Sequence, residues 1–394
     1  MRSSARRRSG RTLPGPKRLK EILPTLRKAR DPTDVAQSEA RFRRFGCSVV
    51  TWWPPAEAGE PPAVFESPVG NYRGMSKSGS GTVLAGAHRM TRRRIIEPGT
   101  TWALSRRTTR RHFLLNPDEA RQMERAYWYS LGYAANAHGV SVHAGCLMST
   151  HSHETVTDVR GELPRFLRTF HRLLALTTKA YRKWPEEVFN KRSTGAHELL
   201  TPQATIEALA YLIANPVEAM AVRYAKDWPG AQTLPRDIGA RVIRVRRPDH
   251  YFDPNNPAWP EVIELRLEMP AMLELDYGVE LAQQRIAARV RERERRALQE
   301  AKRSGRSFVG PRRVLRLAHT KRARSYEEFG SLDPQFAAAG HREAAVHAVR
   351  RLRRFNAQYD KALHAWTSGD RNACFPSGTW WMRVCHGARC GPAP

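Results

Sequence analysis

The chain has 394 residues, of which 41% are hydrophobic and ten are Trp, so it can bury a sizeable core and divide into two or three domains. Its 67 Lys and Arg against 38 Asp and Glu give a net charge of +29, which favours a polyanionic partner, nucleic acid first. Because it has no run of eighteen apolar residues and no apolar signal-peptide core at its N-terminus, we expect a cytoplasmic protein without a membrane partner.

Residues 1–89 are rich in Arg, Pro, Gly and Ser and have no periodic hydrophobic pattern, so we expect them to be disordered. Two interpretations of this stretch stay open. It is either a basic DNA-binding tail, or translation starts at Met75 or Met90 and the preceding residues are not part of the protein.

The regular elements are expected to begin after Met90. A strand is predicted over residues 100–109, and the Asn-Pro-Asp-Glu sequence at 116–119 predicts the start of a helix that Gly139 ends. Two strands follow, from 140 to 148 and from the turn at 149–150 to 159, and then helices start near Pro164 and after Thr201. This order predicts an α+β fold in which helices cover a small antiparallel sheet.

His151 and His153 fall on the second strand of the predicted hairpin. Alternate residues of a strand point to one face, so both imidazoles would reach one metal ion. With fourteen histidines in the chain, chance readily produces this spacing, and a third ligand and a nucleophile are needed to support a site. Tyr211 and Asn215 are four residues apart on the helix predicted after Thr201 and therefore share a face, although Tyr211 alone would suit a core edge. Pro216 is expected to kink or interrupt that helix directly after Asn215.

Residues of about 95–235 resemble the single-tyrosine HUH endonucleases, specifically the REP-associated tyrosine transposases. The match rests on four blocks in order, which are Arg106–Thr108, Met148–His153, Tyr211–Val217 with Ala219 and Val222, and Asp227–Gly230. The resemblance implies a ferredoxin-like core over residues 90–235, a divalent metal held by His151, His153 and Asn215, and Tyr211 as the nucleophile. One departure is Ser152, where the family usually has a bulky apolar residue. Since Ser152 would point away from the ligands, we expect it to affect packing rather than chemistry.

The neutral set of two imidazoles and one amide oxygen would take Mg²⁺ or Mn²⁺. The predicted reaction is attack of Tyr211 on a single-stranded or hairpin DNA, which leaves a 5′-phosphotyrosine and a free 3′-OH. With one tyrosine in the motif, a complete reaction on two strand ends implies a homodimer or two sequential nicks. The resemblance places the protein on the bacterial nucleoid. Eight basic residues are predicted to contact the DNA backbone, unless they only form a solvated basic face. They are Arg106, Arg107, Arg110, Arg111, Arg165, Arg168, Arg172 and Lys179.

The last third is predicted to be mainly helical. Residues 236–303 are interpreted as a linker with a solvated charged helix over 284–302, and residues 304–394 as an accessory DNA-binding region with a helix over 344–366. The tail at 375–384 is predicted to be a strand. The five cysteines argue against a disulfide framework, and Cys374, Cys385 and Cys390 lack the paired spacing of a strong zinc motif, so free thiols are preferred.

Two further functional classes stay open beside the transposase. The first is a nucleic-acid-binding protein that keeps the fold without catalysis. The second is a zinc hydrolase that uses His151 and His153 as ligands and Glu154 beside them.

Overall fold

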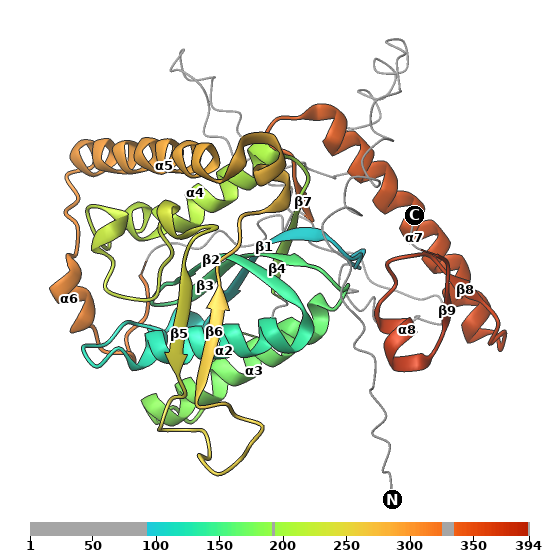
Figure 1. Ribbon diagram of the computed structural model, residues 1–394, viewed down its shortest axis with the longest axis horizontal. Coiled ribbons are helices and arrows are strands. Elements are labelled where there is room, and N and C mark those ends of the chain that lie inside the picture. Colours follow the sequence, from blue (N-terminus) through green and yellow to red (C-terminus); the bar gives the residue numbers. More distant parts are fainter. Residues whose placement is uncertain (1–92, 191–193, 325–334, 393–394) are drawn as a thin grey trace, which may run out of the picture. The chain divides into compact units, whose positions relative to one another are not determined.

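The computed structural model describes residues 93–190, 194–324 and 335–392 (Figure 1). The predictions for residues 1–89, including the two alternative start positions, lie outside these ranges. In the part of the chain that is described, no helix is both long enough and apolar enough to span a membrane.

The core is a βαββαβ unit. Its central strands pair antiparallel, in the order β2-β3-β1-β4, which is the ferredoxin-like arrangement. The predicted α+β class is therefore confirmed. The elements of the unit are β1 (Thr100–Arg107), α2 (Gln122–His138), β2 (Val140–Leu147), β3 (His151–Asp158), α3 (Leu163–Arg182) and β4 (Gly195–Leu199).

Helices cover both faces of this sheet (Figure 1). On one face, α2 and α3 bury a large apolar cluster that includes Trp102, Val156 and Phe166. On the other face lies α4 (Pro202–Glu218), and its residues Leu209 and Ile213 form a second cluster with the opposite side of β2. The sheet is thus buried on both sides, and a short fifth strand, β7 (Phe336–Ala337), extends it by pairing parallel to β4.

Helix boundaries follow local signals with one exception. Gly139 ends α2 in the left-handed conformation (φ 65°), and the Thr201 hydroxyl caps α4 by accepting from the Ala204 N–H at 3.1 Å, both as predicted. The predicted helix start at residues 116–119 is wrong, because α2 begins at Gln122. The carboxylate of Asp118 accepts from the N–H groups of Gln122 and Met123 and so caps the helix from outside it. Contrary to expectation, α4 is not interrupted at Pro216 and runs to Glu218.

Residues 236–303 do not form a solvated connector, and that interpretation is wrong. A hairpin of β5 (Val242–Arg246) and β6 (Val262–Arg266) buries alternate apolar residues against α2. The charged helix α5 (Ala271–Arg303) packs along α4. It buries a stripe of apolar residues that faces the core, at spacings of four, four and seven, which are Ala282, Ile286, Val290 and Ala297. Only the opposite side of α5 is solvated.

The C-terminal region is mainly helical, as predicted. It contains α6 (Pro311–Leu315), α7 (Arg342–Thr367) and α8 (Trp381–His386), with a two-strand parallel pair of β8 (Cys374–Phe375) and β9 (Arg389–Cys390). The predicted strand over 375–384 is wrong because the chain turns at Pro376–Thr379 and becomes helical at Trp381.

Glu154 is a buried carboxylic acid in the core between β3 and α2. The Tyr127 hydroxyl donates to its Oε1 at 3.1 Å, and burial raises the pKa of Glu154 from an ordinary value near 4.5 to about 8. Between these two values the folded chain keeps a proton that the unfolded chain has lost. The contribution of Glu154 to stability is therefore complete below pH 4.5 and is lost as the pH rises through 8.

We expect Glu154→Gln to remove this loss, because an amide of the same shape carries no charge at any pH. Thermal unfolding of the metal-free protein at about pH 5 and about pH 9 measures it, with the wild type losing more stability than the variant between the two. Burial also shifts the pKa of other groups and lowers, for example, that of His143 to about 4. Such groups change the stability of the wild type and the variant by the same amount, so their effect cancels in the comparison. Glu187→Gln, at an exposed position, serves as the control. Parallel pH profiles of wild type and Glu154→Gln would show that Glu154 is ionised throughout.

Candidate active site

The strand β3 places two histidines on the face that α4 covers. His151 lies opposite Arg107 and His153 opposite Ser105 in the β1–β3 register, and the two imidazole centroids are 4.8 Å apart. Ser152 and Glu154 alternate with them and are buried on the α2 side of the sheet. The departure at Ser152 is therefore a feature of the core, away from the histidines.

The helix α4 brings the other two predicted residues to the same place. The amide of Asn215 lies between the two imidazoles, with Oδ1 3.3 Å from His151 Nε2 and Nδ2 3.4 Å from His153 Nε2. The ring of Tyr211, one helical turn earlier, meets the ring of His153 edge to face at 5.4 Å between centroids. Four side chains from one strand and one helix thus converge, as the sequence pattern predicted.

Hydrogen bonds behind the rings fix which nitrogen faces the amide. Thr150 Oγ1 lies 2.9 Å from His151 Nδ1, and the backbone carbonyl of Leu104 accepts a hydrogen bond from the ring of His153. His153 Nε2 accepts from the Asn215 amide N–H, so its proton is on Nδ1, whereas His151 Nε2 donates to the Asn215 oxygen and would bind a metal only in the tautomer protonated on Nδ1. The hydrogen bonds behind the rings are the support that metal-ligating histidines usually have.

Burial and neighbouring arginines keep both histidines neutral. Burial, followed by the charge of Arg107, lowers the pKa of His151 to about 4, and burial, His151 and Arg107 hold the pKa of His153 well below its ordinary value. Burial, followed by the negative charge of Glu218, raises the pKa of Tyr211. The positive charges of Arg107 and Arg293 act in the opposite direction and lower it. At neutral pH the site presents two imidazoles and a phenol, all uncharged.

The donor set fits a hard divalent cation. His151 Nε2 lies 3.3 Å from Asn215 Oδ1, and His153 Nε2 lies 3.4 Å from Nδ2 of the same amide, so both imidazoles and the amide oxygen would reach one cation. The described residues include no group of three or more His, Cys, Asp or Glu side chains arranged to hold a metal. The zinc interpretation of Cys374, Cys385 and Cys390 and the hydrolase built on Glu154 are therefore wrong, the latter because Glu154 lies on the other side of the sheet.

The arginines after β1 divide between the two faces. Arg107 is exposed on the histidine face, Arg111 acts electrostatically on His151, and Arg110 forms an exposed ion pair of 2.5 Å with Glu186. Arg106 points to the other face, where its guanidinium donates to the Asn190 carbonyl at 2.9 Å. Of these four residues, the structure brings Arg107 and Arg111 to the site.

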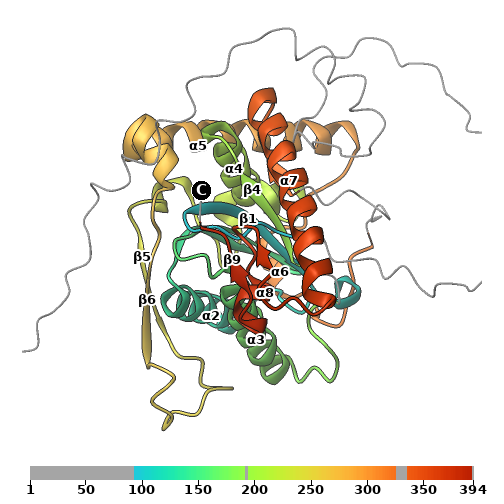
Figure 2. The same ribbon diagram turned by 90° about the vertical axis from the view of Figure 1, so that its right-hand side faces the viewer.

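The basic residues of α3 lie away from the site. This helix is on the opposite side of the sheet from α4 (Figure 2). Arg165 pairs with Glu162 at 3.4 Å and stacks over Trp380 at 5.8 Å. The structure therefore does not bring the α3 residues predicted to bind DNA to the histidines; they are Arg165, Arg168, Arg172 and Lys179.

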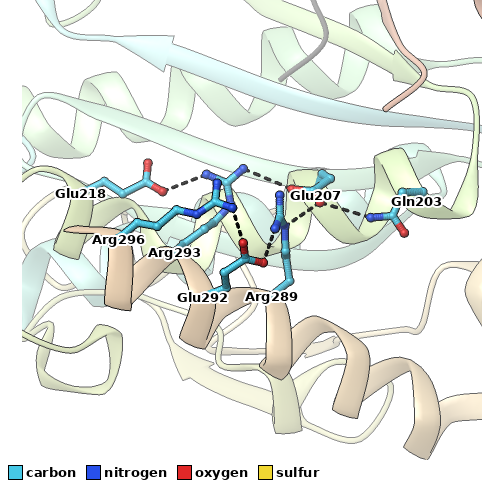
Figure 3. Close-up of polar contacts among 7 residues, drawn as sticks. All are labelled: Gln203, Glu207, Glu218, Arg289, Glu292, Arg293 and Arg296. Atoms are coloured by element: carbon cyan, nitrogen blue, oxygen red, sulfur yellow. Dashed lines mark hydrogen bonds and ion pairs between the residues drawn. The ribbon is translucent and has the colours of Figure 1, made fainter. Parts of the chain in front are cut away.

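An ion-pair network that the sequence analysis missed holds α4 against α5 (Figure 3). Arg293 donates to Glu218 at 2.8 Å and to Glu207 at 3.3 Å, and Arg289 Nε lies 2.6 Å from Glu207. The guanidinium of Arg293 also lies 5.5 Å from the ring centroid of Tyr211. We call these four residues, Glu207, Glu218, Arg289 and Arg293, the α4–α5 clamp. Their spacing was visible in the sequence, because the glutamates share the Tyr211 face of α4 and the arginines are four residues apart.

Comparison with known proteins gives one match. No protein-family model and no curated protein matches the sequence. Among solved structures, the chain is similar to a REP-associated tyrosine transposase bound to a REP hairpin, with 18% identity and a TM-score of 0.32. The match covers 44% of this chain and 99% of the transposase chain.

The clamp predicts a stability effect. Arg293→Gln leaves the carboxylate of Glu218 without its partner, and the Arg293 side chain is only 13% exposed, so we expect a loss of about 1–3 kcal/mol in the free energy of unfolding. Chemical denaturation measures it, with Arg295→Gln on the exposed side of α5 expected to change stability by less than about 0.5 kcal/mol. Equal effects of the two substitutions would mean that the clamp does not stabilise α4.

Proposed function

We propose that this protein is a metal-dependent single-strand DNA endonuclease and strand transferase of the transposase type, with Tyr211 as its nucleophile. The observation that carries the proposal is the position of the Asn215 amide between His151 and His153, with Tyr211 packed edge to face on His153. A tyrosine beside a neutral, three-donor metal site is suited to phosphodiester transfer, and neither imidazole is charged to compete with the cation.

The reaction keeps the number of phosphate ester bonds constant. The hydroxyl oxygen of Tyr211 forms a bond to the scissile phosphorus, and the bond from that phosphorus to the 3′ oxygen breaks. The phenol loses its proton and the departing 3′ oxygen gains one, which gives a 5′-phosphotyrosine and a free 3′-OH. The phosphotyrosine bond retains the energy of the cleaved phosphodiester. The 3′-OH of another DNA end can therefore attack the phosphotyrosine, which joins the two ends and releases Tyr211.

His151, His153 and Asn215 would hold the cation, Mg²⁺ or Mn²⁺. When bound, it supplies Lewis-acid stabilisation of the negative charge that builds up on the non-bridging phosphate oxygens. Arg107 is exposed on the same face and adds a fixed positive charge that attracts the DNA backbone. Arg293 keeps the ring of Tyr211 in place through the clamp, since both of its terminal nitrogens are engaged by carboxylates.

The surroundings of the site favour DNA as the substrate and a single strand as its form. The net charge of +29 suits a polyanion. Tyr211 and both histidines are only half-exposed, so the scissile phosphate must enter between β3 and α4. An unpaired strand bends into such a site more easily than a stiff duplex does.

Tyr211→Phe tests the nucleophile. We expect it to abolish the covalent protein–DNA adduct while it leaves DNA affinity nearly unchanged, because the ring and its packing on His153 remain. A labelled single-stranded hairpin oligonucleotide and a denaturing gel detect the adduct. Tyr224→Phe, at an exposed tyrosine away from the histidines, should form the adduct at the wild-type rate. An adduct in the Tyr211→Phe protein would assign the nucleophile elsewhere, and no adduct in the wild type would favour a binding protein without catalysis.

The metal requirement is tested at Asn215. Chelation should stop adduct formation in the wild type, and added Mn²⁺ should restore it. Asn215→Ala removes one of three ligands, so we expect half-maximal rate to need at least about 10-fold more Mn²⁺. Asn136→Ala, an exposed asparagine on α2, is the matched control and should titrate as the wild type does. If Asn215→Ala needs the same Mn²⁺ concentration for half-maximal rate as the wild type does, the Asn215 amide is not a metal ligand.

A further inference from the structure

A second basic site lies in the C-terminal region, away from the histidines. A cavity of about 1040 Å³ opens between α7 and the C-terminal pair β8–β9, and the segment that leads into β1 closes one side of it. Its floor is apolar, because Phe355, Ala362 and Phe375 are buried there. The position of β8 and β9 alongside α7 can be followed in Figure 1.

Three cations of α7 line this cavity and have no acidic partner among the described residues. Arg350, Arg354 and Lys361 are exposed, and no carboxylate within the described ranges forms an ion pair with any of them. Arg351, on the same side of the helix, differs because Glu198 and Glu97 pair with it.

One carboxylate that lines the cavity is otherwise engaged. Asp370 accepts from the Asn372 N–H at 2.9 Å and so stabilises its own turn. Within the part of the chain that the structure describes, carboxylates thus pair with Arg351 and with none of the other three cations.

The spacing of these cations fits a chain of phosphates better than a single one. Positions 350, 354 and 361 share one side of α7, and a rise of about 1.5 Å per residue spreads them over roughly 16 Å. A single phosphate group could reach one of them, or two. An extended polyanion can reach all three.

We infer that this cavity binds the phosphate backbone of single-stranded DNA, as a second contact for the strand that Tyr211 cleaves. The inference rests on the proposed function for the choice of DNA. The chain's own N-terminal 92 residues are the other candidate occupant, but they carry 18 Lys and Arg against 7 Asp and Glu, and the cations of α7 would repel them.

The two sites lie at opposite ends of β1. Ile95 and Glu97 of the cavity precede β1, whereas Arg107 at its far end faces His151, and an eight-residue strand is about 25 Å long. A strand held in the cavity therefore reaches the active site across several nucleotides. The cavity fixes DNA outside the cleaved bond and so sets which phosphate meets Tyr211.

Two cysteines give a test that needs no substitution. Cys374 lines the cavity and is exposed, whereas Cys385 is exposed and lies outside the lining. We expect an oligo-dT of about 20 nucleotides to slow alkylation of Cys374 by iodoacetamide roughly 10-fold and to leave Cys385 unaffected, as read by peptide mass spectrometry of the full chain. Equal rates with and without the oligonucleotide at Cys374, or equal protection by a blunt duplex, would overturn the inference.

Charge removal gives an independent measurement by fluorescence anisotropy. The triple variant Arg350→Gln, Arg354→Gln, Lys361→Gln should bind the oligonucleotide about 10-fold more weakly and lower the salt slope of the affinity by about 2, since each phosphate contact of a single strand contributes about 0.7. The matched control, which removes three exposed arginines outside the cavity, is Arg342→Gln, Arg353→Gln, Arg383→Gln. Equal losses in the two triple variants would show that only total charge matters and would refute the cavity site.

The outcome can be separated from that of the proposed function. Alkylation in the Tyr211→Phe protein reports the cavity without any cleavage. Protection of Cys374 there supports the cavity site even if the wild type forms no adduct. An adduct without protection of Cys374 supports the nuclease and overturns the cavity site.

Discussion

The pairing of β3 with β1 and β2 is the interaction on which the site depends. Because side chains alternate along a strand, the register that turns His151 and His153 toward α4 also turns Ser152 and Glu154 into the core beneath α2. A slip of one residue would bury the imidazoles and expose a carboxylic acid to Tyr211, so the hydrophobic contacts of the core and the chemistry of the site select the same register. The core packing therefore protects the site geometry.

The second constraint is the orientation of α4, which comes from outside the βαββαβ unit. Glu207 and Glu218 share a face of α4 with Tyr211 and Asn215, and Arg289 and Arg293 of α5 engage the two glutamates. Buried ion pairs add little net stability, but they tolerate few alternative geometries. A helix held in this way has one rotation about its axis, and that rotation aims Asn215 between the histidines. The residues after 235 thus help to position the side chains of the candidate site.

Sequence patterns were sufficient where the determinants are local. The strand alternation at His151 and His153, the four-residue spacing of Tyr211 and Asn215, and the helix boundaries at Gly139 and Thr201 all follow from residues close together in the chain. The failures involve distant partners. The charges of α5 suggested a solvated helix because their partners are on α4, some 80 residues earlier, and β7 is too short to give a periodic signal. At 116–119 the sequence predicted a helix start, but the Asp118 carboxylate accepts from the N–H groups of Gln122 and Met123, and the helix begins only at Gln122.

The pairing of β4 with β7 has a consequence during synthesis. Leu199 pairs with Ala337, so the edge of β4 keeps unpaired N–H and C=O groups until the ribosome has released the later segment. At about 5–20 residues per second, the roughly 140 intervening residues take roughly 7–30 seconds to emerge. If the four strands β1 to β4 pair as they emerge, the nascent chain holds this sheet with its β4 edge open for that time. A binding partner or chaperone that covers β4 during translation would compete directly with the attachment of the C-terminal region.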